Sequence, residues 1–341
     1  MRDSEKEILL GSQYDNIRLL KLDLLTNPTE ADEVGSFDSD QWVKPTVEFL
    51  TAPSFSALCM FYGEQLYDEL DVPIGLIQTA WGGTIVEAWS PPEVMQECGV
   101  EDEGTNGNQN HNSYLWNAMV HPLLRMSIKG AIWYQGEANT HHNMQIYDCT
   151  FSSMISSWRQ RWHEATAGDT EQNFPFGFIQ LAPNKDTISP NWPVLRWKQT
   201  GGYGYVPNEL MENVFMAVAM DDDIDLHPKN KRLPATRLAW AASNLVYGNS
   251  GRPLQGPQVI RVDEQSPEGS KDVVTGINVT FSAVLREPAL EDDRFMVCCS
   301  ESMDLCDERN YGQEQGWQGV KMVGSFTEGN NWPPSLRRES R

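Results

Sequence analysis

Four short apolar runs, each turning polar at its carboxyl end, constrain the fold of this chain more than any other feature. The runs are IGLIQTAW (74–81), GAIWYQGEAN (130–139), PFGFIQLAP (175–183) and NVFMAVAMDDD (213–223). Helical patterns lie between them; in residues 147–162 large apolar side chains recur every three or four positions. Continuous apolar strands that alternate with helices predict a parallel sheet covered by helices on both faces.

Further segments extend this pattern through residues 1–250. IRLLK (17–21) predicts another strand, and residues 49–70 predict one helix with a long apolar face. The segment after His227 predicts a helix that stops at Gly248. We therefore expect an α/β domain over these residues.

The pattern changes after about residue 255. Alternating apolar and polar residues without an intervening helical pattern predict antiparallel strands in PQVIRVDEQ (257–265), GINVTFSAV (276–284) and DRFMVCCS (293–300). We expect a smaller β-rich region over residues 255–330 and a frayed polar tail over 331–341.

Composition narrows the possible partners. The 341 residues are 40% hydrophobic and include 12 tryptophans, which predicts a globular chain. The formal charge of −22 disfavours nucleic acid and anionic membranes, so we expect neither as a partner. The sequence has no apolar run of eighteen residues and no secretory signal at its start, so as written it carries neither a membrane span nor an export address.

Cysteine and histidine spacing gives no metal motif. The six cysteines form no CxxC pair, which leaves disulfides possible and makes a zinc site improbable. A ligand set of Glu137, His141 and His142 matches no standard spacing, so we expect no metal. The sequon at Asn278 would accept a glycan only in a secreted chain.

Polar groups follow the predicted strands at the edge where a parallel sheet places its active site. Gly82 and Gly83 come directly after one strand, either as a tight turn or as backbone N–H donors to an oxyanion. Gln135, Glu137 and Asn139 follow the next strand, where an amide can donate and a carboxylate can orient a neighbour. These residues predict a catalytic or binding site.

His227 stands out among the six histidines because it follows a run of aspartates and precedes a proline. A carboxylate beside an imidazole orients it as a proton acceptor. The pattern therefore predicts a general base that needs a nucleophile.

Several blocks resemble the sialate O-acetylesterase family of SGNH-type hydrolases. They are IGLIQTAWGGTIVEAWS, LWNAMVHPLLRMSIKGAIWYQGEAN, FPFGFIQLAP, LRWKQT and VFMAVAMD with HPKNK, within a match that runs from about Ile17 to Gly248. The resemblance implies a three-layer α/β/α, flavodoxin-like domain. It also implies removal of O-acetyl groups from sialic acid, or from a related acetylated sugar, by a serine and a histidine base without a cofactor.

The same resemblance assigns individual positions. His227 matches the base, and Gly82 and Gly83 match the glycine that lends an oxyanion N–H group. Gln135 matches the polar oxyanion block, while Glu137 and Arg196 lie in matching motifs as candidate substrate-binding residues.

The chain departs from its relatives in the acid that orients the base. Many relatives place an aspartate three residues before the histidine, where this chain has Ile224. Asp223, Asp225 or a backbone carbonyl could serve instead, and we favour Asp225.

The nucleophile is the second departure. The family's serine belongs to a Gly-Gln-Ser-Asn motif upstream of IRLLK, and this motif is absent from the 341 residues. Ser12 and Ser90 lie in blocks that match other parts of the family. We therefore expect a domain that lacks its first strand and is inactive as written, with a non-catalytic carbohydrate-binding or interaction paralogue as the alternative. The resemblance also implies a lysosomal or secreted protein, for which Cys298, Cys299 and Cys306 could form disulfides.

Overall fold

The computed structural model describes residues 3–35, 42–51, 55–101, 108–183, 191–219, 225–256, 258–265 and 276–281. The chain divides into two compact units, Met1–Gln255 and Gly256–Arg341. Each unit is described by itself.

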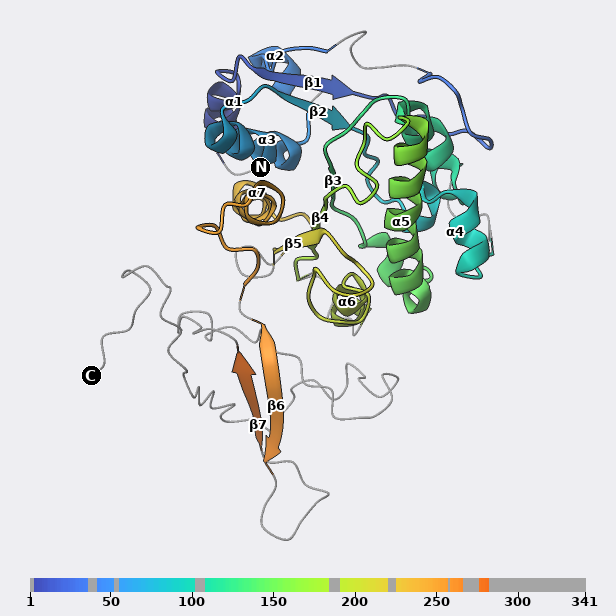
Figure 1. The fold of residues 1–341 in the computed structure, drawn as a ribbon, viewed down its shortest axis with the longest axis vertical. Helices are drawn as coiled ribbons and strands as arrows, with labels where there is room; N and C mark the ends of the chain where they lie inside the picture. Colours follow the sequence, from blue (N-terminus) through green and yellow to red (C-terminus); the bar gives the residue numbers. More distant parts are fainter. Residues whose placement is uncertain are drawn as a thin grey trace, which may run out of the picture. The chain divides into compact units, whose positions relative to one another are not determined.

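The first unit contains two parallel sheets (Figure 1). One pairs β1 (Ile17–Lys21) with β2 (Ile74–Gln78). The other has the order β3-β4-β5, formed by Ala131–Trp133, Phe176–Gln180 and Val214–Val218. All five strands fall within the predicted segments, which confirms the α/β class.

The helices of this unit are α1 (Ser4–Gly11), α2 (Val47–Thr51), α3 (Ala57–Leu70), α4 (Pro92–Glu97), α5 (Tyr147–Ala165), α6 (Asn191–Lys198) and α7 (Arg232–Tyr247). Side chains of α3 and α7 form one core with β4 and β5, through residues such as Phe61, Leu238 and Phe215. Side chains of α5 form a second core with β3 and β4, around Phe151 and Phe176. Helices therefore cover both faces of the sheet layer, as expected for a three-layer α/β/α domain.

The predicted stripe of α5 is confirmed. Its six large apolar residues are buried: Tyr147, Phe151, Met154, Ile155, Trp158 and Trp162. They meet the aromatic side chains of β3 and β4, for example in the edge-to-face contact of Phe151 with Phe178, whose ring centroids are 5.5 Å apart.

One expectation was wrong in detail. Residues 49–70 form two helices, α2 and α3, instead of one. Pro53 cannot continue a helix, and Ser56 caps α3 by accepting a hydrogen bond from the backbone N–H of Cys59.

The parallel strands lie in two sheets, because no described strand joins β2 to β3.

The described part of the second unit is an antiparallel pair, β6 (Val259–Gln265) and β7 (Gly276–Phe281). This agrees with the alternating patterns of residues 257–265 and 276–284. Asn278 lies in β7. The strand predicted at 293–300, the three cysteines near it and the tail 331–341 lie outside the described residues.

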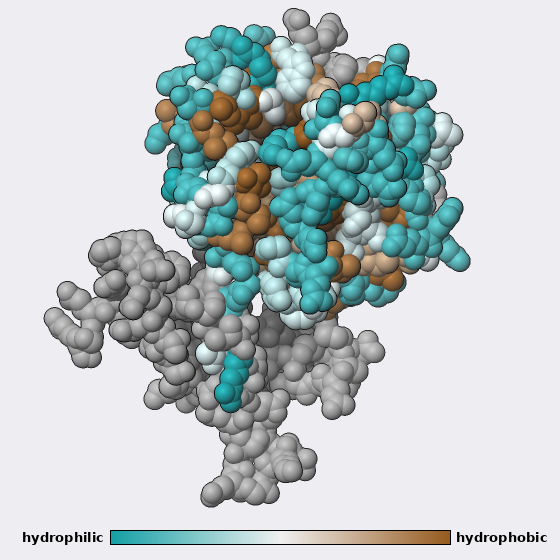
Figure 2. Space-filling view, viewed as in Figure 1, coloured by the Kyte–Doolittle hydropathy of each residue, from teal (hydrophilic) through white to brown (hydrophobic). Residues whose placement is uncertain are grey.

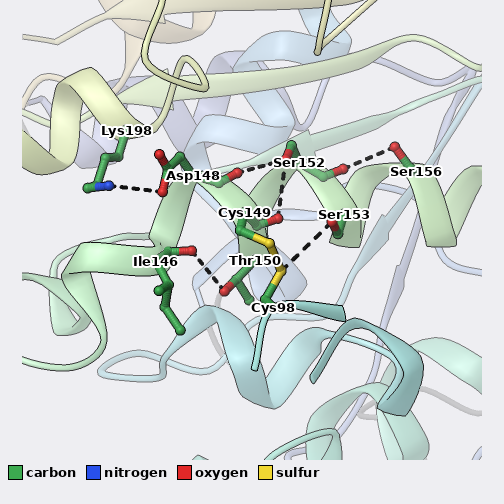
Figure 3. Close-up of a disulfide and its surroundings, with 9 residues drawn as sticks. All are labelled: Cys98, Ile146, Asp148, Cys149, Thr150, Ser152, Ser153, Ser156 and Lys198. Atoms are coloured by element: carbon green, nitrogen blue, oxygen red, sulfur yellow. Dashed lines mark hydrogen bonds and ion pairs between the residues drawn. A yellow bond between two sulfur atoms is a disulfide. The ribbon is translucent and has the colours of Figure 1, made fainter. Parts of the chain in front are cut away.

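A disulfide joins Cys98, at the end of α4, to Cys149 in the first turn of α5 (Figure 3). Their Cα atoms are 5.8 Å apart. The sequence left disulfides possible but did not indicate this pair. The bond ties two elements that are 51 residues apart in the sequence.

The face of the first unit seen in Figure 2 is mostly hydrophilic, with hydrophobic patches among the polar side chains. Leu9, Trp42 and Trp197 are among its exposed large side chains. None of the described helices is long and apolar enough to cross a membrane.

A buried acidic cluster joins α1, α3 and α7. Glu64 is 1% exposed, and its Oε2 accepts a hydrogen bond from Arg232 Nη2 at 3.0 Å. Arg232 also pairs with Glu7, whereas Oε1 of Glu64 has no hydrogen-bond partner among the described residues. Burial raises the pKa of Glu64 from 4.5 to about 7, against the opposing effect of Arg232.

This raised pKa predicts a pH-dependent stability. Between the unfolded and folded pKa values the folded state binds more protons, so stability falls as the pH rises from about 4.5 to about 7. The loss should reach about 3 kcal/mol. Urea unfolding at several pH values measures it, and Glu64→Gln should flatten this part of the profile. An unchanged slope in that variant would contradict the assignment, and Glu48→Gln, at an exposed position, is the matched control.

Candidate active site

The turn after β2 carries Gly82 and Gly83. Gly83 has a φ of +78°, and a Cβ placed on either glycine would meet no atom within 4 Å. Thr84 Oγ1 donates to the Trp81 carbonyl at 2.7 Å, and Asn110 Nδ2 donates to the Gly83 carbonyl at 3.3 Å. These two hydrogen bonds hold the turn in place, while the space beside both glycines is open. A ligand can therefore approach the backbone of the turn closely.

The two glycines should respond differently to substitution. Gly83→Ala places a side chain in the left-handed region and should cost about 1 kcal/mol of unfolding free energy. Gly82→Ala lacks this strain and is the matched control, because both positions are equally open. Thermal or urea unfolding of the two variants measures the difference. Equal losses would show that the positive φ at Gly83 carries no cost.

Gln135 links the turn after β3 to the glycine turn. Its Nε2 donates to the Thr84 carbonyl at 3.0 Å and to Asn139 Oδ1 at 2.6 Å. Its Oε1 accepts from Tyr147, and its carbonyl accepts from Gln199 Nε2. Both donors of the amide therefore contact protein groups, and in this arrangement Gln135 positions the two turns.

Asn139 and Glu87 form the centre of the same network and are both 0% exposed. Asn139 Nδ2 donates to Glu87 Oε2 at 2.9 Å and to the His142 carbonyl at 3.1 Å. Its Oδ1 accepts from the backbone N–H of Val86 at 2.9 Å, in addition to Gln135. Sequence reasoning singled out Asn139 but missed Glu87. The one sequence feature that points to Glu87 is its carboxylate within the otherwise apolar segment that follows the glycine turn.

Glu137 follows β3 and His227 follows β5. Burial raises the pKa of Glu137, while the charges of Lys231 and His227 oppose that shift. His227 is exposed, and its backbone N–H donates to Asp225 Oδ1 at 3.0 Å. Asp225 thus shapes the turn that carries the histidine. The alternative acid, Asp223, lies outside the described residues.

Arg196 lies on α6. Its Nη1 is buried and has no hydrogen-bond partner within the described part of the chain. Burial lowers the pKa of its guanidinium to about 10. A desolvated guanidinium with an unused donor favours an anionic ligand.

The two serines considered from the sequence are engaged elsewhere. Ser12 donates to the Leu9 carbonyl at the end of α1. Ser90 is 0% exposed and donates to the Val86 carbonyl at 2.9 Å. Neither hydroxyl is placed as a free nucleophile. Over the described residues no group of three His, Cys, Asp or Glu side chains could hold a metal ion.

Comparison with known proteins gives one family. Residues 25–205 match the model of "Carbohydrate esterase, sialic acid-specific acetylesterase". The chain is 37% identical over 317 residues to human sialate O-acetylesterase, covering 88% of this chain and 59% of that protein. It is 33% identical over 342 residues to the mouse sialate O-acetylesterase, covering 88% and 62%. The chain thus spans about three fifths of the length of these relatives.

A solved structure agrees with these sequence relatives. A carbohydrate acetylesterase from Xanthomonas citri superimposes with a TM-score of 0.60 at 26% identity, over 73% of this chain and 53% of that one. Two parallel sheets covered by helices, with polar residues after their strands, fit this neighbour. The chain belongs to the carbohydrate esterase family of sialic acid-specific acetylesterases.

Proposed function

We propose that this chain forms the base-bearing part of an esterase that hydrolyses O-acetyl esters of sialic acid. The observation that carries the proposal is the hydrogen bond from Gln135 Nε2 to the Thr84 carbonyl, which ties the turn after β3 to the glycine turn, together with the place of His227 after β5. A proton acceptor after β5 and backbone donors after β2 thus follow the carboxyl ends of parallel strands. Family membership provides the reaction class.

The proposed mechanism is acyl transfer to a serine. The serine oxygen attacks the ester carbonyl while His227 accepts the hydroxyl proton, and the protonated imidazole then returns it to the leaving sugar hydroxyl. Backbone N–H groups of the glycine turn stabilise the negative charge on the carbonyl oxygen. Water then releases acetate by the reverse sequence.

The nucleophile is proposed to lie outside these 341 residues, because the Gly-Gln-Ser-Asn motif is absent and Ser12 and Ser90 are engaged. The 341-residue chain alone should therefore release no acetate above background. Loss of the nucleophile removes most of the acceleration, because the remaining groups act together with it.

Arg196 supports an acidic sugar as the substrate. Sialic acid carries a carboxylate, and the unused donor of Arg196 could pair with it. Arg196→Gln should weaken hydrolysis of an O-acetylated sialoside at least tenfold and leave its methyl ester, which lacks the charge, unaffected. Equal effects on both would favour a neutral acetylated sugar as the substrate.

The compartment is proposed to be lysosomal or secreted. The support is the Cys98–Cys149 disulfide, because such bonds persist in oxidising environments. Peptide mapping of native material under non-reducing conditions tests this. Two free thiols at these positions would contradict it.

The function is tested with an extended chain, in which the segments of human sialate O-acetylesterase outside the matched span are joined to these 341 residues. It should release acetate from an O-acetylated sialoside, and His227→Ala should lower the rate by at least about 10³-fold. His163→Ala is the control, because His163 binds the Thr170 carbonyl at the end of α5. A folded extended chain without activity would favour the non-catalytic paralogue, and activity insensitive to His227 would refute the assigned base.

A further inference from the structure

The end of α6 and the segment after it expose several large side chains within residues 197–210, here called the aromatic loop. Trp197, on α6, is 54% exposed, and Tyr203, Tyr205 and Leu210 are exposed as well. Large apolar side chains gathered on one exposed loop mark a surface that contacts a ligand or a partner.

The backbone of the aromatic loop holds the Trp197 ring in place. A Cβ on Gly204 would lie 2.8 Å from Cζ3 of Trp197, so the loop backbone packs directly against the ring. The N–H of Gly204 donates to Thr200 Oγ1 at 2.8 Å. Asn208 Nδ2 donates to the carbonyls of Thr200 and Tyr205 at 2.9 and 2.8 Å. The ring is thus supported by a braced loop while more than half of the side chain stays exposed.

Tyr203 and Tyr205 extend the aromatic surface. Their rings meet edge to face, with centroids 6.2 Å apart and planes at 82°. Both side chains are exposed. Each therefore offers an apolar ring beside a hydroxyl that can donate or accept a hydrogen bond.

A polar groove adjoins the aromatic loop through Leu210. The Leu210 side chain packs on the backbone of Gly201, where an added Cβ would lie 2.8 Å from its Cδ2. Leu210 also lines a groove of about 250 Å³ beside α4 and α5, whose other lining residues are four serines, Gln160, Glu93 and Glu97. Pockets for drug-sized ligands measure about 300–1,000 Å³, so this groove suits a ligand of one ring.

The Cys98–Cys149 disulfide fixes the walls of this groove. It joins the end of α4 to the first turn of α5, and Ser152, Ser153 and Ser156 follow along α5 (Figure 3). A groove with covalently tied walls keeps its shape without a ligand, which lowers the entropic cost of binding.

The charges at the groove favour an uncharged ligand. Glu93 is paired with Arg161, whose Nη2 lies 2.7 Å from its Oε2, and it also accepts a hydrogen bond from Ser157. Glu97 is exposed and is the second carboxylate of the lining. Among the described residues, no lysine or arginine lines the groove. A carboxylate or phosphate would therefore meet negative charge without a cation to offset it.

We propose that the aromatic loop and this groove bind an uncharged sugar. The apolar C–H face of a pyranose ring packs on an aromatic ring such as that of Trp197, while its hydroxyls bond to serine hydroxyls, an amide and a carboxylate. A purely apolar ligand would leave the polar groups of the groove unpaired. None of these residues belongs to the network around Asn139, so binding here does not rest on the proposed function.

NMR titration of the 341-residue chain with lactose, an uncharged disaccharide, tests the proposal. The methyl signals of Leu210 and the indole signal of Trp197 should shift together, with a Kd of about 1 mM because few side chains contact the sugar. The methyl signals of Leu238, which is buried in the core of α7, should not move. A folded chain in which neither Leu210 nor Trp197 responds would overturn the proposal.

Matched variants separate the ring from the groove. Trp197→Ala should weaken lactose binding, followed at Leu210, at least about tenfold, and Trp197→Phe should restore most of it because an aromatic face remains. Trp42→Ala is the control, because Trp42 is exposed outside the aromatic loop. Ser156→Leu should fill the groove and weaken binding at least about threefold, whereas Ala165→Leu, exposed on the same helix outside the groove, should not. Equal effects of Trp197→Ala and Trp42→Ala would refute the assigned ring.

Other occupants give other results. A lysine-rich peptide that shifts the same signals at a lower concentration than lactose would assign the surface to a cation and overturn the proposal. Free sialic acid, which carries a carboxylate, should bind more weakly than lactose, and equal binding would contradict the uncharged ligand. Shifts that grow with protein concentration without sugar would assign the surface to a second copy of the chain. Lactose binding that is lost in Trp197→Ala and kept in Trp42→Ala supports the proposal whether or not the extended chain releases acetate.

Discussion

Asn139→Ala is expected to lower the free energy of unfolding by about 4 kcal/mol. The substitution removes four hydrogen bonds of a residue that is 0% exposed. It leaves the Val86 N–H, one donor of Gln135 and the Glu87 carboxylate without this partner. Each buried unsatisfied group costs about 1–3 kcal/mol, and a charged one costs more.

Urea unfolding measures this loss. Asn16→Ala is the matched control, because Asn16 is exposed and donates a single hydrogen bond to Tyr67 at 3.0 Å; its loss should stay below about 1 kcal/mol. In the extended chain, Asn139→Ala should also lower kcat for acetate release, since the glycine turn loses its support. A loss of stability similar to that of the control would show that the network contributes little.

Removal of the Cys98–Cys149 disulfide should have the second large effect. The bond closes a segment of 51 residues, so the chain-entropy relation predicts about 4 kcal/mol of stabilisation through the unfolded state. The Cys98→Ser and Cys149→Ser double variant should show this loss in urea. Wild-type protein with dithiothreitol should unfold at the same urea concentration as the double variant.

Cys59 provides the control for cysteine substitution. It is the one free cysteine of the described residues, and burial raises its pKa to about 12. Cys59→Ala should change stability far less and should leave the effect of dithiothreitol intact. Insensitivity of the wild type to reductant would contradict the disulfide.

The sequence predicted the strands and α5 well because their signals are local. The apolar runs at 176–180 and 214–218 and the stripe from Tyr147 to Trp162 need no knowledge of partners. The break within residues 49–70 also has local sequence signals, the proline at 53 and the capping serine at 56. The apolar periodicity that continues across these positions nevertheless predicted a single helix.

Other features depend on the tertiary structure and could not be derived from spacing. Six cysteines allow many pairings, and nothing in the sequence favours Cys98 with Cys149. The engagement of both Gln135 donors follows from the approach of Thr84 and Asn139, which are 51 and 4 residues away. The separation of β1-β2 from β3-β4-β5 likewise depends on which strands pair in the folded domain, and strand spacing alone does not give this.

The central claim is that His227 is the base for a serine nucleophile outside these 341 residues. Labelling of the extended chain with a fluorophosphonate, followed by peptide mass spectrometry, tests it most directly. We predict one modified serine, outside these 341 residues, and loss of the labelling in His227→Ala. Labelling of Ser12, Ser90 or any other serine within the 341 residues, or labelling that persists without His227, would contradict the account.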